Sequence, residues 1–146
     1  MKKGVCIKML FNILFKLSRK SGVINFIFKR LYSCDIPRKV NFCGSYNSVS
    51  FPPNALGVVI HPNAKIGKNV CIQHHVLLGQ KKTNIDAPII KDNVIINPYS
   101  IIIGKVIIGE NSIIGAGSIV TKDVPANSIY YNKVIPFIKT NLKSDK

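Results

Sequence analysis

Aliphatic residues recur at every sixth position through the middle of this 146-residue chain, and this period constrains its fold more than any other feature. Ten of eleven successive positions at this spacing carry a large aliphatic side chain. The eleven are Ile60, Ile66, Ile72, Leu78, Asn84, Ile90, Ile96, Ile102, Ile108, Ile114 and Val120, with Asn84 as the exception. Four places after each of them the residue is mostly small or β-branched, which gives a second stripe beside the first.

A period of six fits neither the 3.6-residue turn of a helix nor the simple alternation of a long strand. It fits short strands joined by turns, in which each hexad directs two side chains inward. Turn-forming residues follow the aliphatic positions, as in Gly67 to Asn69 and Gly115 to Gly117. Three such strands per coil, stacked coil on coil, enclose a column of aliphatic side chains. The sequence therefore predicts an all-β fold, a parallel β-helix.

The repeat also predicts the domain organisation. Its phase extends back to Ile36, so we place the β-helix at residues 34–126, with five coils of three hexads each. Two interruptions are expected, one at Ser48 and Asn54 and one in the polar stretch 79–88, where a loop leaves the coil. Residues 127–146 lose the repeat and are predicted to form a tail that wraps back on the solenoid.

Residues 1–33 have a different pattern, with apolar residues at helical spacing and Lys or Arg between them. Gly22 divides the stretch, which predicts two short helices. A basic amphipathic helix is suited to an anionic membrane surface. The alternative is that the apolar face caps the end of the solenoid or packs on a neighbouring subunit.

Composition narrows the choice of partners and location. There are 21 Lys and Arg against 6 Asp and Glu, a net charge of +15, which favours phosphate-bearing ligands and acidic surfaces. Nucleic acid is not expected, because the basic residues are not interleaved with surface aromatics.

The four cysteines lack metal-ligand spacing, so we expect buried thiols and no metal. Without a cleavage site or an apolar run of membrane-spanning length, the expected location is cytoplasmic, with peripheral contact at the inner membrane face as a further expectation.

Three segments carry a family resemblance: 57–69 (GVVIHPNAKIGKN), 87–94 (APIIKDNV) and 113–125 (IIGAGSIVTKDVP). The pattern resembles the left-handed β-helix hexapeptide-repeat acyltransferases, and 57–69 is similar to the serine acetyltransferase branch. The resemblance covers about residues 34 to 139. It implies a left-handed solenoid, a homotrimer with active sites between subunits, and transfer of the acetyl group of acetyl-CoA to an acceptor.

Acetyl transfer to a hydroxyl needs a base, and neutral imidazole suits that role. The three histidines of the chain are His61, His74 and His75. In serine acetyltransferases the catalytic histidine follows the Ile-His-Pro segment by thirteen residues, and that spacing from His61 leads to His74. We therefore expect His74 to be the base. His75 is expected to point away from it and to contact the acceptor, whereas His61 is expected to be mainly structural, with acceptor contact as its second role.

Two departures from the serine acetyltransferase pattern bear on the acceptor. Val59 stands where the family has the carboxylate that orients its histidine, and Ala87 stands where it has a second active-site histidine. We also expect no long helical domain, since about thirty residues stand before the repeat. We therefore expect an O-acetyltransferase that acts on a sugar hydroxyl in surface polysaccharide synthesis. The alternatives are serine acetyltransferase of cysteine biosynthesis and a non-catalytic assembly module.

The resemblance also assigns residues to the donor. Ala116 is expected to line the pantetheine arm of CoA, and Thr121 with Lys122 to approach its nucleotide end. Lys139 corresponds to a basic position in the family's tail. Lysine side chains and backbone amides at the edge of a solenoid suit the phosphates of CoA.

Overall fold

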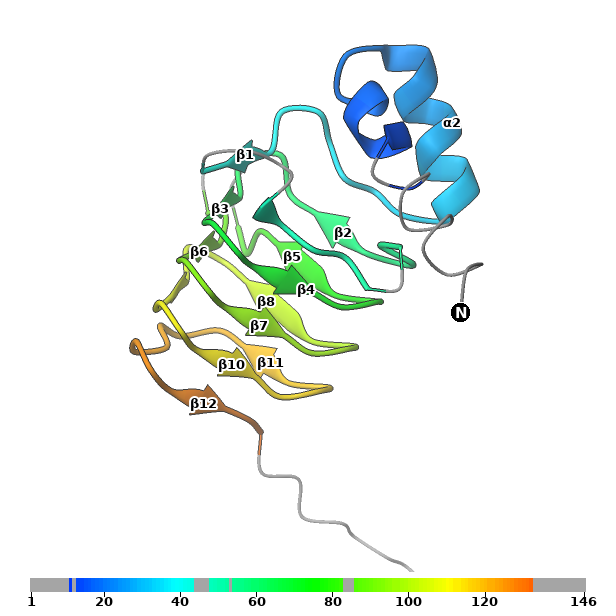
Figure 1. The fold of residues 1–146 in the computed structure, drawn as a ribbon. Coiled ribbons are helices and arrows are strands. Elements are labelled where there is room, and N and C mark those ends of the chain that lie inside the picture. The colour runs from blue at the N-terminus through cyan, green and yellow to red at the C-terminus, as the bar shows by residue number, and fades with distance from the viewer. Residues whose placement is uncertain (1–10, 12, 44–47, 53, 83–85, 133–146) are drawn as a thin grey trace, which may run out of the picture.

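The computed structural model describes residues 11, 13–43, 48–52, 54–82 and 86–132, which form a helical cap followed by a stack of coils (Figure 1). Residues 11 and 13–18 lie in a first helix, and α2 (Gly22–Tyr32) follows after a short turn. The two short helices expected from the sequence are thus confirmed, but the division lies at residues 19–21, and Gly22 is the first residue of α2. Neither helix, over its described residues, has the length and apolar character that crossing a membrane requires.

The coils are built from two- and three-residue strands that form three parallel sheets. Sheet 1 contains β2 (Val59–Ile60), β5 (Leu77–Gly79), β8 (Ile101–Ile103) and β11 (Ile119–Val120). Sheet 2 contains β1 (Asn41–Phe42), β3 (Lys65–Ile66), β6 (Ile89–Ile90) and β9 (Ile107–Ile108). Sheet 3 contains β4 (Cys71–Ile72), β7 (Ile95–Ile96), β10 (Ile113–Ile114) and β12 (Ile129–Tyr130). The chain visits the sheets in the order 1, 2, 3 in every coil, which confirms the β-helix.

The core is the column of aliphatic residues that the hexads predict. The nine aliphatic members of the first stripe from Ile60 to Ile114 are no more than 2% exposed. The second stripe is buried beside them except at Lys82, which is exposed. A regular coil takes eighteen residues, since Ile95 pairs with Ile113. Leu77 instead pairs with Ile101, twenty-four residues on, because the chain between β5 and β6 is six residues longer than a regular connection. The loop expected at 79–88 lies there.

The last coil is shorter than the repeat predicts. Ile108 pairs with Val124, sixteen residues on, so Val124 takes a place in the first stripe and not the predicted second one. The carboxylate of Asp123 accepts a hydrogen bond from Ile107 N at 2.8 Å and so replaces a missing backbone acceptor. The chain then forms β12, so parallel stacking continues past residue 126, the sequence-derived boundary.

Side chains hydrogen-bond the outer backbone groups of β11, the last strand of sheet 1. The hydroxyl of Tyr130 donates to Ile119 O at 3.0 Å, and the side-chain oxygen of Asn132 accepts from Ile119 N. The amide of Asn132 also donates to the Tyr130 hydroxyl at 3.3 Å. The backbone groups of β11 that would pair with a further coil are therefore occupied.

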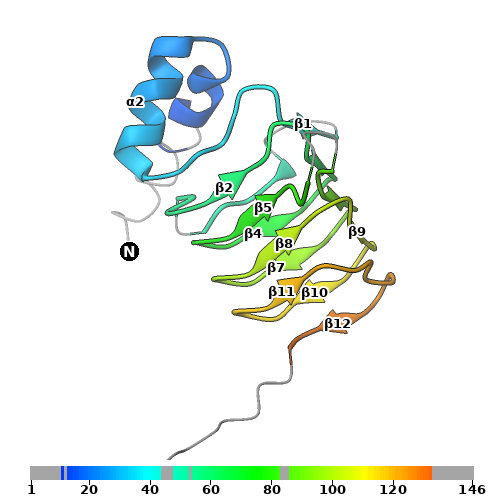
Figure 2. The same ribbon diagram turned by 180° about the vertical axis from the view of Figure 1, so that it is seen from behind.

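The helical cap closes the opposite end of the stack with aromatic rings. Phe15 is the centre of this cluster, with ring centroids 5.4 Å from Phe28, 5.6 Å from Phe51 and 6.2 Å from Phe42. One face of the helices therefore covers the first coil, as the capping alternative predicts. Figures 1 and 2 show the cap at the β1 end of the solenoid, far from β12.

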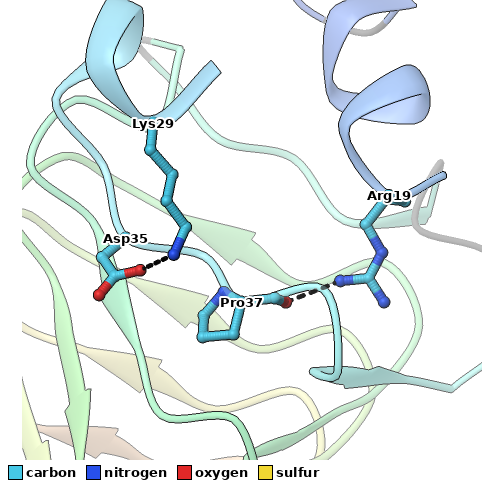
Figure 3. Close-up of polar contacts among 4 residues, drawn as sticks. All are labelled: Arg19, Lys29, Asp35 and Pro37. Carbon is cyan, nitrogen blue, oxygen red and sulfur yellow. Dashed lines mark hydrogen bonds and ion pairs between the residues drawn. The ribbon is translucent and has the colours of Figure 1, made fainter. Parts of the chain in front are cut away.

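Polar contacts fix the cap to the chain that enters the solenoid (Figure 3). The Arg19 guanidinium donates to Pro37 O at 2.9 Å and to Val40 O at 3.0 Å, and Lys29 forms an ion pair with Asp35. Burial, and to a smaller extent the nearby charge of Arg38, lower the pKa of Arg19. Three cysteines are described, and all are free thiols. Cys34 is buried, which raises its pKa to about 11, but Cys43 is exposed, so the expectation of buried thiols is wrong there.

Candidate functional site

The corner between sheets 3 and 1 carries two of the three histidines, and we call it the histidine corner. It comprises the turns 73–76, 97–100 and 115–118, together with 54–57 in the preceding coil. The corresponding residue of each turn is at positive φ: Gly57 at 65°, His75 at 56°, Tyr99 at 59° and Gly117 at 67°. In the turn 54–57, Asn54 and Ala55 are also at positive φ, 55° and 58°. Turns stack through backbone bonds, with His75 N donating to Leu56 O at 2.8 Å and Tyr99 N to His74 O at 3.2 Å.

The two histidine side chains of this corner touch each other. Nδ1 of His74 lies 3.1 Å from Nδ1 of His75, within hydrogen-bonding distance, and the rings are perpendicular. The sequence reasoning that adjacent side chains point apart is wrong here. That rule holds for a strand, whereas the left-handed backbone of His75 turns its side chain back toward its neighbour.

His75 is held in a slot between two other turns. The ring of Tyr99 stacks on it, with centroids 4.8 Å apart and planes at 11°. On the other side lies Gly57, where an added Cβ would come within 2.6 Å of Cδ2 of His75. Tyr99 also meets the edge of His74 at 5.3 Å. Sequence reasoning missed Tyr99, although it occupies the same place in its turn as His75 does.

His61 lies away from this pair. It follows β2 at the corner between sheets 1 and 2, whereas His74 and His75 precede β5, so the two groups are at opposite ends of sheet 1. Nδ1 of His61 accepts a hydrogen bond from Asn63 N at 3.2 Å. This bond to turn backbone is the kind of contact expected of a structural histidine.

The residues assigned to the donor lie along and beyond the histidine corner. Ala116 is exposed and has the same place in its turn as His74, two coils on, which is roughly 10 Å at the usual strand spacing. Thr121 and Lys122 are exposed at the other end of β11. The fourth residue, Lys139, lies outside the described residues.

The two family positions that differ in this chain carry no acid or base. Val59 lies on β2 with its side chain outward and is 39% exposed. Ala87 is buried, with 4% exposed. Within the described part of the chain, no three His, Cys, Asp or Glu side chains gather as metal ligands would. The chemistry available at the histidine corner is therefore that of imidazole and phenol.

Comparison with known proteins confirms the family resemblance. Residues 87–122 match the family described as bacterial transferase hexapeptide (six repeats). The serine acetyltransferase of Bacillus subtilis is 40% identical over 77 residues, which is 51% of this chain and 36% of that protein. The serine acetyltransferase of Mycobacterium tuberculosis is 38% identical over 81 residues, or 54% of this chain and 35% of the relative. The chain thus spans about a third of the length of these relatives.

A solved structure gives the same result for the fold. The serine acetyltransferase of Neisseria gonorrhoeae in complex with serine superposes with a TM-score of 0.64 at 30% identity, covering 78% of this chain and 47% of that one. The expected fold class, a left-handed parallel β-helix with short N-terminal helices, is confirmed.

Proposed function

We propose that this hexapeptide-repeat protein is an acetyl-CoA-dependent O-acetyltransferase whose base is His74. The observation that carries the proposal is the half-buried imidazole of His74 at a solenoid corner, hydrogen-bonded through Nδ1 and in line with Ala116. The similarity to serine acetyltransferases supports the same activity.

The proposed reaction requires a group that accepts the proton of the acceptor hydroxyl. Nε2 of His74 takes the proton of the acceptor hydroxyl while its oxygen attacks the carbonyl carbon of the acetyl thioester. The tetrahedral intermediate then collapses, the carbon–sulfur bond breaks, and the imidazolium returns the proton to the CoA sulfur. The products are the acetyl ester and free CoA.

The donor is expected to run along the histidine corner. Ala116 is exposed and has the same turn position as His74. This supports a pantetheine arm that runs along the histidine corner toward the base. The positive charge of Lys122 suits the nucleotide phosphates. Lys122→Glu is expected to raise the KM for acetyl-CoA and leave kcat nearly unchanged, measured against Lys68→Glu, an exposed lysine on another corner. An unchanged KM would place the nucleotide elsewhere.

Serine is the acceptor that the relatives support, since the matched proteins are serine acetyltransferases and one of them was solved with serine bound. This favours the serine alternative over the sugar hydroxyl expected from the sequence. Sugars remain the second candidate because of Val59 and Ala87, which provide neither the carboxylate nor the imidazole of the serine enzymes.

The decisive experiment measures thiol release from acetyl-CoA in the presence of L-serine or a panel of sugars. Formation of O-acetylserine that is lost in His74→Ala supports the serine enzyme, and an acetylated sugar supports the second candidate. The absence of turnover with every acceptor would favour the non-catalytic assembly module.

We propose a homotrimer as the active form. Its support is the aliphatic character of the outward strand residues on two sheets, such as Val59 and Ile119 on sheet 1 and Ile129 on sheet 3, which are 39% to 69% exposed. Light scattering at micromolar concentration is expected to give three times the chain mass. A monomer that is active would contradict the proposal.

We propose a cytoplasmic location with peripheral attachment to the inner membrane face through the outer side of the helical cap. Four apolar side chains of α2 are 54% to 72% exposed, and exposed Arg30 lies among them: Val23, Phe26, Ile27 and Leu31. A second copy would bring like charges together, whereas an anionic bilayer is complementary.

Sedimentation with vesicles containing phosphatidylglycerol tests this attachment. The protein is expected to sediment with these vesicles and not with phosphatidylcholine alone, and Phe26→Asp is expected to abolish binding. The control is Tyr131→Asp, which changes an equally exposed residue just after β12. Binding that survives Phe26→Asp would overturn the proposal.

A further inference from the structure

The proposed base lacks the carboxylate that would orient it, because that position is occupied by Val59. An aliphatic side chain can neither accept a hydrogen bond nor stabilise the positive charge that a histidine acquires when it takes a proton. If His74 is the base, its Nδ1 needs another acceptor. In the structure, Nδ1 of His74 lies within hydrogen-bonding distance of Nδ1 of His75, at 3.1 Å.

We propose that His75 is the positioning residue of the proposed acetyl transfer, taking the place of the missing carboxylate. This inference rests on the proposed function. A hydrogen bond between two imidazole nitrogens requires one to donate and the other to accept. When Nδ1–H of His74 donates and the bare Nδ1 of His75 accepts, the lone pair on Nε2 of His74 is free to receive the acceptor proton.

The same arrangement supports the charged state. Once Nε2 of His74 is protonated, its Nδ1–H still donates to neutral His75, and the bond becomes charge-assisted and stronger. His75 keeps its own proton on Nε2 throughout, so no second proton moves. The role matches that of the aspartate in a catalytic triad, which orients the base and stabilises its imidazolium.

The surroundings of His75 give the acceptor nitrogen a fixed direction. Stacking by Tyr99 at 4.8 Å on one face and the absence of a side chain at Gly57 on the other define the plane of its ring. The backbone of His75 is also held at φ 56°, which a histidine adopts at a cost.

Two substitutions at position 75 separate the acceptor role from the backbone role, because both tolerate positive φ. His75→Asn keeps an acceptor oxygen close to the place of Nδ1, whereas His75→Gly removes it. His75→Gly is expected to lower kcat about ten- to a hundredfold with an unchanged KM for acetyl-CoA, and His75→Asn to stay within about threefold of the wild type.

A result in which His75→Gly keeps full kcat would overturn the proposal. It would equally be overturned if that variant changed only the KM of the acceptor, since this is the acceptor contact expected from the sequence.

A measurement that does not depend on turnover separates this inference from the proposed function. Long-range ¹H–¹⁵N spectra of the histidine-labelled protein report which ring nitrogen carries the proton. His74 is expected to be protonated at Nδ1 in the wild type and at Nε2 in His75→Gly. Finding Nε2–H on His74 in the wild type would refute the positioning role even if the enzyme is active, whereas Nδ1–H without turnover would count against the proposed function alone.

Discussion

Two corners of the solenoid make the same left-handed turn and fill it with different residues. At the corner between sheets 2 and 3, which we call the asparagine corner, the four positions at positive φ are all asparagine: Asn69, Asn93, Asn111 and Asn127. Their side chains form a ladder, each amide donating to the next side-chain oxygen at 3.0 to 3.2 Å. At the histidine corner the corresponding positions are Gly57, His75, Tyr99 and Gly117.

The difference indicates what each corner is for. Asparagine adopts positive φ more readily than most residues with a side chain. The hydrogen bonds between stacked asparagine side chains also offset the free-energy cost of the turn. Histidine and tyrosine in this conformation cost free energy, of order 1 to 3 kcal/mol each, without a comparable ladder. Strain of this kind is tolerated where another property of the side chain matters, which is consistent with the histidine corner as the site of chemistry.

The largest expected effect is at His74. His74→Ala is expected to lower kcat by roughly two to four orders of magnitude, the usual contribution of a general base, with acetyl-CoA affinity close to wild type. The control is Asn111→Gly at the asparagine corner, which is expected to leave kcat unchanged. Steady-state kinetics measure both variants. If His75→Ala abolished turnover and His74→Ala were nearly silent, the assignment of the base would be wrong by one residue.

A smaller effect, on stability alone, is expected in the asparagine ladder. Asn93→Ala removes bonds to both Asn69 and Asn111 and places alanine at φ 58°, so it is expected to lower the free energy of unfolding by about 2 to 3 kcal/mol. Asn93→Gly loses the bonds without the strain and should cost about 1 kcal/mol less. Urea unfolding measures both, and equal stability of the two variants would contradict the strain argument.

At Tyr99 stability and activity are expected to change in opposite directions. Tyr99→Asn relieves an unfavourable backbone conformation and is expected to raise the free energy of unfolding by up to about 1 kcal/mol. It also removes the ring that stacks on His75, so kcat is expected to fall. Tyr99→Phe keeps the ring and should leave both properties close to wild type. A Tyr99→Asn variant that is less stable would show that the two corners do not differ as described.

The smallest effect is expected at His61. His61→Ala removes the acceptor for Asn63 N and is expected to cost about 0.5 to 1 kcal/mol of unfolding free energy. Thermal unfolding measures this cost. The KM for the acceptor tests the second role expected from the sequence, since an increase in that KM with unchanged stability would make His61 a binding residue.

The sequence predicts the fold well because burial imposes the hexad directly. Ile60 and Ile114 can lie inside only if every intervening hexad keeps the same phase, and an aliphatic at each sixth position leaves few other folds. The shortened last coil could not be predicted in the same way. Val124 suits either stripe, so the loss of two residues leaves the aliphatic pattern unchanged and appears only in the pairing with Ile108.

The candidate site was harder to predict, because its contacts depend on backbone conformation and coil register. The family spacing leads to His74, but the bond to His75 follows from a positive φ that no rule for histidine predicts. Tyr99 lies twenty-four residues after His75 and not eighteen, since the loop after β5 shifts the register by six. Sequence periodicity alone therefore does not place Tyr99 at the histidine corner beside His75.

The closed ends of the stack limit how copies of this chain can associate. A solenoid is a short length of cross-β structure, and an unprotected last coil would recruit the first coil of another molecule into a growing filament. Here Tyr130 and Asn132 already occupy the free N–H and C=O of Ile119, and Phe15 and its neighbours obstruct the other end. Growth along the solenoid axis is thereby hindered at sheet 1 at the β12 end and by the helical cap at the β1 end, which favours assembly through the flanks.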